Sequence, residues 1–128
     1  MSELNTNKEF SLYKRAKSFV YASRGLRLFF KTTHNAWIEL LVFLGVAIFG
    51  IYFGITSLEW AMIIFAAGLV LVAEAFNTAI EIDMNLTSPE HHPYAKDTKD
   101  VAAGAVLISS VVAAVVGILI FWKYLKAL

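Results

Sequence analysis

Residues 58–82 read LEWAMIIFAAGLVLVAEAFNTAIEI, an apolar run that is charged only at Glu59, Glu74 and Glu81. Further apolar runs lie on either side of it, at about residues 36–55 and 101–122. A hydrocarbon core about 30 Å thick is crossed by about 20 helical residues, and the runs lack the alternation of a spanning strand. The sequence therefore predicts an all-α integral membrane protein with three transmembrane helices.

The composition supports a membrane protein. The chain has 128 residues, of which 59% are hydrophobic and 16% are charged, and its mean hydropathy is +0.65. Soluble domains carry about 25% charged residues. Cysteine is absent, which excludes disulfides and thiolate chemistry. The net charge of +1 gives no indication of nucleic acid, so we expect no such partner. We predict a single domain over residues 1–128.

The positions of lysine and arginine predict the orientation in the membrane. Seven of these residues precede the first span, and Lys96 and Lys99 lie between the second and third spans. The connection between the first two spans has none. Positive loops face the cytoplasm, so we predict a cytoplasmic N-terminus and a cytoplasmic loop at residues 85–98. The C-terminus is then outside, despite Lys123 and Lys126.

Residues 10–32 are predicted to form an amphipathic surface helix. One face collects residues at alternating spacings of four and three: Leu12, Ala16, Phe19, Ser23, Leu26 and Phe30. Basic residues lie on the opposite face. Such a helix can rest in the membrane interface with its apolar side toward the acyl chains. It could be a simple anchor, or it could form one wall of a lipid-binding site.

Small residues and prolines predict contacts and helix ends. Gly50 and Gly54 form a GxxxG pair, which is typical of close helix packing. Pro89 and Pro93 lie in the predicted loop at 85–98, where they would end helices.

The second span ends in a polar face. At 100° per residue, Glu74, Asn77, Glu81 and Asn85 fall within about 80° of one another, and Asp83 points elsewhere. Charged residues within a span are costly and usually face a bundle interior or a polar cavity. Glu74 lies about two turns deeper than Glu81, which is roughly 10 Å. Two carboxylates and an amide exceed what packing requires, so we predict a functional site.

The third span begins with Lys99 and Asp100, at the same predicted level as Glu81. Carboxylates can hold Mg²⁺ while phosphates fill its remaining positions, and a lysine can neutralise phosphate charge. A deeper carboxylate can take a proton from an alcohol held in the bilayer. These are the parts that phosphoryl transfer requires. The sequence has neither a GxxxxGK[ST] loop nor a GxGxxG motif.

The chain resembles the prokaryotic diacylglycerol kinase family, which includes undecaprenol kinases, from about residue 14 to residue 122. The segment 74–81, EAFNTAIE, is similar to the family pattern E-x-x-N-[ST]-A-I-E. Further matches are KDVAAGAVL at 99–107 and SFVYASRG at 18–25. The resemblance implies a homotrimeric bundle of three-span subunits, each with a surface helix. It implies Mg²⁺-dependent transfer of the ATP γ-phosphate to a lipid alcohol, in sites that are shared between subunits. It also implies that the protein lies in the bacterial inner membrane.

The resemblance also implies roles for individual residues. Glu74 matches the catalytic base, Glu81 matches a Mg²⁺ ligand that also contacts the nucleotide, and Asn77 matches a supporting asparagine between them. The remaining matches are nucleotide contacts: Tyr21, Glu90, His92, Lys99 and Asp100.

Two positions depart from the family pattern. Thr33 stands where the family usually has a glutamate that is a second Mg²⁺ ligand. A neutral hydroxyl is a poorer ligand, so His34, Glu39 or water would have to compensate. Asn85 stands where aspartate is common, which removes a charge one turn past Glu81.

Three questions stay open from the sequence. We expect diacylglycerol as the acceptor, which would be converted to phosphatidic acid. Undecaprenol is the alternative, because both lipids present a hydroxyl at the interface. A small proton-coupled transporter could use Glu74 as its proton carrier, but it has no use for Lys99 and Asp100. A non-catalytic membrane assembly subunit would need neither Mg²⁺ nor ATP.

Overall fold

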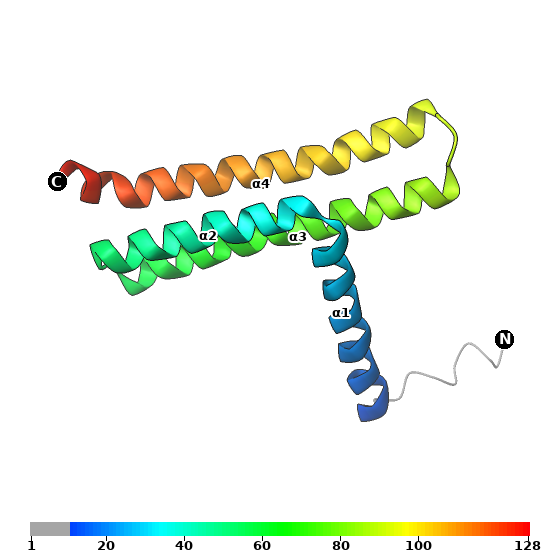
Figure 1. Cartoon of the computed structure of the whole chain (residues 1–128), viewed down its shortest axis with the longest axis horizontal. Coiled ribbons are helices and arrows are strands. Elements are labelled where there is room, and N and C mark those ends of the chain that lie inside the picture. Colours follow the sequence, from blue (N-terminus) through cyan, green and yellow to red (C-terminus); the bar gives the residue numbers. More distant parts are fainter. Residues whose placement is uncertain (1–10) are drawn as a thin grey trace. The chain divides into compact units, whose positions relative to one another are not determined.

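The computed structural model describes residues 11–128, and these form four helices with no strand among them (Figure 1). They are α1 (Leu12–Thr32), α2 (His34–Phe53), α3 (Ser57–Thr87) and α4 (Pro93–Lys126). Helices α2, α3 and α4 are each long and apolar enough to cross a membrane. The predicted all-α fold with one surface helix and three spans is confirmed. Phe10, where the surface helix was predicted to begin, lies outside the described residues.

Helix α1 belongs to a compact unit that ends at Thr32, and the other three helices form a second unit. The Ser11 hydroxyl accepts a hydrogen bond from the backbone N–H of Lys14 (3.4 Å) at the start of α1. The apolar face of α1 is largely bare, with Leu12, Phe19 and Leu26 all exposed. An exposed apolar face suits a helix that rests in the membrane interface.

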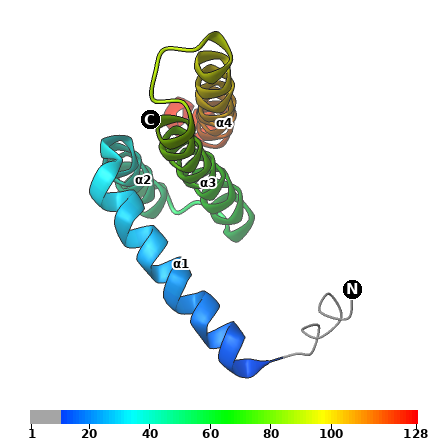
Figure 2. The ribbon, with the colours of Figure 1, turned by 90° about the vertical axis from the view of Figure 1, so that its right-hand side faces the viewer.

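In the second unit, α3 lies between α2 and α4 (Figure 2). Residues 88–92 connect α3 to α4 at what we call the loop end, on the right of Figure 1. Residues 54–56 connect α2 to α3 at the opposite end, the turn end, where the C-terminus also lies. The three helices therefore alternate in direction, and the beginning of α2 lies at the loop end.

The turn end depends on Gly54. Its backbone is left-handed (φ 65°, ψ 49°), which favours glycine, and the N–H of Ile55 bonds to the carbonyl of Gly50 (3.1 Å). A Cβ at Gly50 would lie 2.8 Å from Cη2 of Trp60 on α3. Gly50 is thus a close-contact position, as predicted for the GxxxG pair, whereas Gly54 ends α2.

The connection between α3 and α4 at the loop end is shorter than predicted. Helix α3 continues to Thr87 and α4 already begins at Pro93, so the prediction of a loop over 85–98 was wrong. Proline is tolerated in the first helical turn because its missing N–H would be unpaired there anyway. The Nδ1 atom of His92 accepts a hydrogen bond from the Tyr94 N–H (3.2 Å) and caps the helix. Lys96 and Lys99 consequently lie on the first turns of α4.

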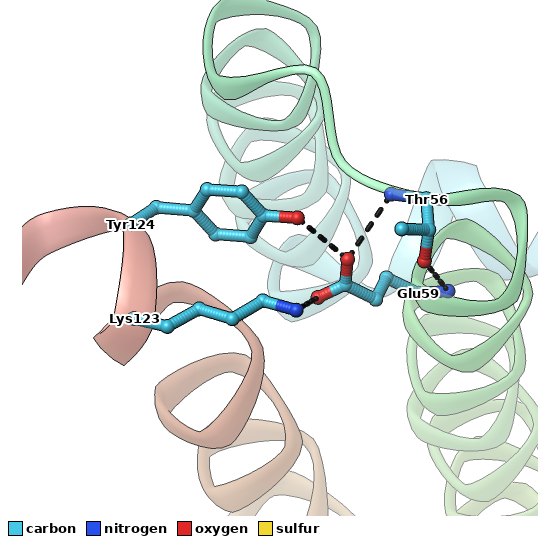
Figure 3. A network of polar contacts seen from close by, with 4 residues as sticks. All are labelled: Thr56, Glu59, Lys123 and Tyr124. Atoms are coloured by element: carbon cyan, nitrogen blue, oxygen red, sulfur yellow. Dashed lines mark hydrogen bonds and ion pairs between the residues drawn. The ribbon is translucent and has the colours of Figure 1, made fainter. Parts of the chain in front are cut away.

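Glu59 is the centre of a polar network at the turn end (Figure 3). Its Oε1 accepts hydrogen bonds from the Thr56 N–H (3.1 Å) and the Tyr124 hydroxyl (2.7 Å). Its Oε2 lies 3.2 Å from Nζ of Lys123. The Thr56 hydroxyl completes a capping box by accepting from the Glu59 N–H (3.2 Å). This network ties the end of α4 to the beginning of α3.

Apolar packing within the chain is concentrated at the turn end. Ile55, Ile63 and Ile120 are buried there, with aromatic residues such as Trp60 and Phe121 against them. Most other large apolar side chains of α2–α4 are exposed. Helices with so little burial inside one chain offer surfaces for lipid tails or for other helices.

Candidate active site

The four polar residues that the sequence predicted on one face all lie on α3. The helix runs unbroken through Glu74, Asn77, Glu81 and Asn85 toward the loop end. The predicted common face therefore holds, because residues three or four apart are neighbours on a helix.

Glu74 is the most enclosed of these groups, with only 2% of its surface exposed. The side chain of Glu39, on α2, comes near the Glu74 carboxyl. The Oε2 atom of Glu39 is buried and has no hydrogen-bond partner within residues 11–128. Sequence reasoning treated Glu39 only as a substitute metal ligand. A lone carboxylate inside an apolar run was the signal that could have indicated a more specific role.

Asn77 and Glu81 form the next pair along the helix. The Asn77 Nδ2 donates a hydrogen bond to Oε1 of Glu81 (3.3 Å), and Glu81 is exposed. The Oδ1 atom of Asn77 is buried and has no partner within the described residues. Burying an unpaired carbonyl oxygen is costly, so this oxygen is available to a donor or a cation that the chain alone does not supply.

Lys99 bridges α4 to α3. Its Nζ donates a hydrogen bond to Oδ1 of Asn85 (2.6 Å), which lies one turn beyond Glu81. The structure thus brings Lys99 to α3 about one helical turn beyond Glu81. From the sequence we noted only that Asn85 lacks the charge of the aspartate common at this position. We did not predict that its side chain accepts a hydrogen bond from Lys99.

Asp100 pairs along its own helix. Its Oδ2 lies 2.6 Å from Nζ of Lys96, one turn earlier on α4, and both side chains are 61% exposed. Lys96 was not among the predicted site residues. An exposed pair of this kind contributes little to stability, so both groups can exchange it for a charged ligand at low cost.

Three further residues were predicted as nucleotide contacts: Tyr21, Glu90 and His92. Tyr21 is exposed on α1, which belongs to the separate unit. Glu90 is exposed in the connection at the loop end. His92 caps α4 through Nδ1, which leaves its other ring nitrogen outside that bond.

The residues present can hold Mg²⁺ only with help from a ligand. No three histidine or acidic side chains within residues 11–128 come together as a metal cluster. Mg²⁺ in phosphoryl-transfer sites often uses one or two carboxylates and takes its other oxygens from phosphates and water. Glu81, exposed and next to the orphaned Asn77 oxygen, fits that smaller requirement.

Thr33 does not replace the usual acidic ligand. Its hydroxyl is hydrogen bonded to the Thr78 hydroxyl on α3 (2.8 Å), a contact that joins the start of α2 to α3. Glu39 is next to Glu74, so it also does not compensate for the missing ligand beside Glu81. Neither Thr33 nor Glu39 therefore adds an acidic ligand beside Glu81.

The site thus presents two environments along α3. The buried carboxyl of Glu74 lies further along α3 from the loop end, with the half-buried Glu39 near it, while an exposed carboxylate, a lysine and a carboxylate–lysine pair lie at the loop end. This arrangement defines a membrane protein whose reactive polar groups lie at one end of its spanning helices. It can bring a charged, water-soluble ligand next to an alcohol that is anchored in lipid.

Comparison with known proteins identifies the family. A sequence model described as "prokaryotic diacylglycerol kinase" matches residues 20–121. The undecaprenol kinase of Bacillus subtilis (strain 168) is 38% identical over 82% of this chain and 85% of its own length. The diacylglycerol kinase of Helicobacter pylori (strain 26695) is 32% identical over 100% and 98%. That of Escherichia coli (strain K12) is 27% identical over 84% and 88%.

The chain belongs to the prokaryotic diacylglycerol kinase family. Its members named here are membrane lipid kinases, which are phosphotransferases with an alcohol acceptor. The resemblance found in the sequence is confirmed, and so is the enzyme class.

Proposed function

We propose that this chain transfers the γ-phosphoryl group of Mg·ATP to the hydroxyl group of a membrane lipid, with Glu74 as the general base. The observation that carries the proposal is the buried Glu74, deep in a span, on a helix whose exposed end bears Glu81 and contacts Lys99. The family match over residues 20–121 supports the reaction class. A transporter or an assembly subunit would not require this combination.

The depth of each group suggests its task. A lipid alcohol is anchored by its own chains, so its hydroxyl reaches the deeper residue, and a base must lie within hydrogen-bonding reach of the proton it takes. The acceptor oxygen forms a bond to the γ-phosphorus as the bond to the β–γ bridging oxygen breaks. The hydroxyl proton goes to Glu74, and ADP leaves with the electron pair of the broken bond.

The loop end suits the nucleotide. Lys99 places a positive charge one turn from Glu81, where it can neutralise a phosphate oxygen. Asp100, Glu90, His92 and Tyr21 are proposed as further nucleotide contacts on the basis of the family resemblance. Glu81 would hold Mg²⁺, with the Asn77 amide supporting its carboxylate. The metal ion would supply neutralisation of the charge on the phosphate oxygens.

Two acceptors are candidates. The sequence led us to expect diacylglycerol, which the Helicobacter pylori and Escherichia coli relatives carry in their names. The Bacillus subtilis undecaprenol kinase is 38% identical to this chain, and those two diacylglycerol kinases are 32% and 27% identical. These values favour undecaprenol as the acceptor.

The deciding experiment is a competition assay. Purified protein in lipid bilayers receives Mg·ATP with diacylglycerol and undecaprenol together, and the phosphorylated lipids are quantified. We expect ATP consumption that depends on a lipid alcohol and on Mg²⁺, with undecaprenyl phosphate as the main product. The Glu74→Gln variant is the inactive control. ATP consumption without lipid phosphate, or none at all with either lipid, would overturn the proposed function.

We further propose a homotrimer in the bacterial inner membrane, with a cytoplasmic N-terminus and loop end. Composite sites predict that mixing inactive Glu74→Gln subunits with inactive Lys99→Ala subunits restores some activity. No recovery would indicate sites built within one chain.

Orientation is tested by labelling Ser57→Cys and Ser88→Cys in intact cells. If the turn end faces the outside of the cell, Ser57→Cys should be labelled before Ser88→Cys.

A further inference from the structure

Two lysines lie on the first turns of α4, and their partners differ in charge. Nζ of Lys96 lies 2.6 Å from Oδ2 of Asp100, a carboxylate on the same helix. Nζ of Lys99 donates a hydrogen bond of 2.6 Å to Oδ1 of Asn85, a neutral amide on α3. One ammonium group is therefore paired with an opposite charge, whereas the other is held in place and keeps its full charge.

The acidic residues of α4 that are closest in sequence to Lys99 are not its partners. Asp100 is paired with Lys96. Asp97 lies two residues before Lys99, which places it on the other side of the helix. Lys99 is also partly buried, whereas Lys96 is exposed. The contact of Lys99 with α3 is thus built by the packing of two helices, unlike the local pair that Lys96 forms.

Glu81 has the same kind of neutral support. Its Oε1 accepts a hydrogen bond from Nδ2 of Asn77 (3.3 Å), one turn earlier on α3. Asn85, one turn later on the same face, holds Lys99. Opposite charges at this spacing attract each other, and yet each is bound to an amide. The two asparagines thus hold a negative group and a positive group next to each other, each with a neutral partner.

We propose that Asn85 is a positioning residue for the nucleotide, because it holds Lys99 at α3 and leaves the lysine charge for a phosphate group. An ammonium group has three hydrogen-bond donors. Asn85 uses one of them, and the others can bond to phosphate oxygens. This inference rests on the proposed function, because it takes a nucleotide phosphate as the ligand of Lys99. Asn85 itself acts through the lysine.

A neutral partner suits this task better than either alternative. Without a partner, the long lysine side chain would be mobile, and binding would have to order it. With a carboxylate, which is common at this position in the family, the lysine would already be paired, and a phosphate group would have to displace that partner. The amide of Asn85 orients the lysine without competing with the phosphate charge.

The test measures ADP binding to the purified protein in lipid bilayers, with Mg²⁺ and without it. Asn85→Asp keeps the size and the accepting oxygen of the side chain but adds a negative charge. We expect ADP binding to weaken by at least about threefold in both conditions, an effect in the range of an exposed ion pair. In steady-state assays the KM for ATP should rise while kcat changes little.

Thr87→Asp is the matched control for the added charge. It places a carboxylate two residues further along α3, on the side of the helix away from Asn85. ADP binding to this variant should stay close to that of wild type. In a Lys99→Ala background, Asn85→Asp should have no further effect on ADP binding, because Asn85 acts through this lysine.

Amine labelling reports the contact directly and requires no turnover. The modification of Lys99 by an amine-reactive reagent is quantified by mass spectrometry, with the exposed Lys126 as an internal reference. ADP should protect Lys99 from modification in wild type. Asn85→Ala should make Lys99 more reactive and should weaken ADP binding, because the lysine is no longer held.

Each outcome separates this inference from its rivals. Equal weakening by Asn85→Asp and Thr87→Asp would show a general charge effect and would overturn the inference. An effect of Asn85→Asp that persists in the Lys99→Ala background, or that requires Mg²⁺, would also overturn it. A lower melting temperature of Asn85→Ala with unchanged ADP binding would show a contact that only joins two helices, with the same consequence. If ADP protects Lys99 but wild type has no lipid-dependent turnover, the proposed transfer is contradicted and the nucleotide contact is retained.

Discussion

Helix α3 carries two buried glutamates that the rest of the chain treats differently. Glu59, at the turn end, is enclosed by a backbone N–H, a tyrosine hydroxyl and a lysine, all within hydrogen-bonding distance. Glu74, toward the loop end, is more deeply buried, yet the group beside it is another carboxyl. One carboxyl is surrounded by hydrogen-bonding and charged partners from its own chain, while the other has a second carboxyl near it.

The difference indicates what each glutamate contributes. Compensated buried charges fix geometry, and removing one partner leaves the others unpaired. A buried carboxyl with an uncompensated neighbour destabilises the fold, and such costs are typical of functional sites. We therefore expect substitutions at the two ends to have different effects. Those toward the loop end should change turnover, and those at the turn end should change the stability of the fold.

The largest effect is expected for Glu74→Gln. It should lower kcat by about 10²–10⁴-fold, the usual contribution of a general base, while Mg·ATP binding stays nearly intact. Thermal unfolding should not shift downward, because a neutral amide removes a buried charge. Steady-state rates and Mg·ATP titration of the same preparation test both parts. If Glu74→Gln lost Mg·ATP binding while Glu81→Gln kept it, the two assignments would be reversed.

Glu81→Gln should act on the nucleotide side of the site. Loss of the exposed carboxylate should raise the Mg²⁺ concentration needed for half-maximal rate by at least about tenfold, since even outer-shell changes cost about 10–100-fold in metal affinity. Titration of the rate with Mg²⁺ at saturating ATP provides the measurement. Asp83→Asn, two residues further along α3, is the control and should behave as wild type. An equal shift in both variants would point to a general surface-charge effect.

At the turn end, Glu59→Gln should lower the melting temperature in detergent because it removes the partner of Lys123 and weakens the bond from Tyr124. Turnover well below that temperature should persist. Tyr124→Phe should have a smaller effect, and the double variant should lose less than the sum of the two, because the residues share one network. Additive losses would show that they act independently. Lys126→Gln is the control for removing a C-terminal charge.

The smallest expected effect is on packing alone. Gly50→Ala should destabilise the protein by about 1–3 kcal/mol, the usual cost of overpacking, because the added Cβ would meet the Trp60 indole at 2.8 Å. Gly45→Ala in the same helix meets nothing within 4 Å and should be neutral or slightly stabilising. Chemical unfolding of the two variants side by side provides the comparison. Equal stability would contradict the close contact between α2 and α3.

The fold was predictable because its main determinants are local. Apolar runs of spanning length and the periodicity of the surface helix fixed four helices from the sequence. The loop end was misjudged because Pro93 was taken to end a helix, whereas it begins one behind the His92 cap. Proline has opposite meanings at the two ends of a helix, and only the capping contact decides between them.

The candidate site was predictable where its residues share a helix, and less so where different helices meet. The spacing from Glu74 to Asn85 placed four groups on one face. It could not indicate that Glu39 lies beside Glu74, that Asn85 holds Lys99, or that Tyr124 reaches Glu59. These contacts depend on the register of packed helices, which periodicity within one segment does not contain.

Helices α3 and α4 are joined by a hydrogen bond near each end, Glu59 to Tyr124 and Asn85 to Lys99. Nearly the same number of residues separates these two contacts along each helix. One residue inserted into or deleted from either helix would turn everything beyond it by about 100° and shift it by about 1.5 Å, so both contacts could not persist. Over evolution, changes in chain length should therefore fall in residues 88–92 or beyond the C-terminal contact, while the lengths of α3 and α4 between these contacts change together.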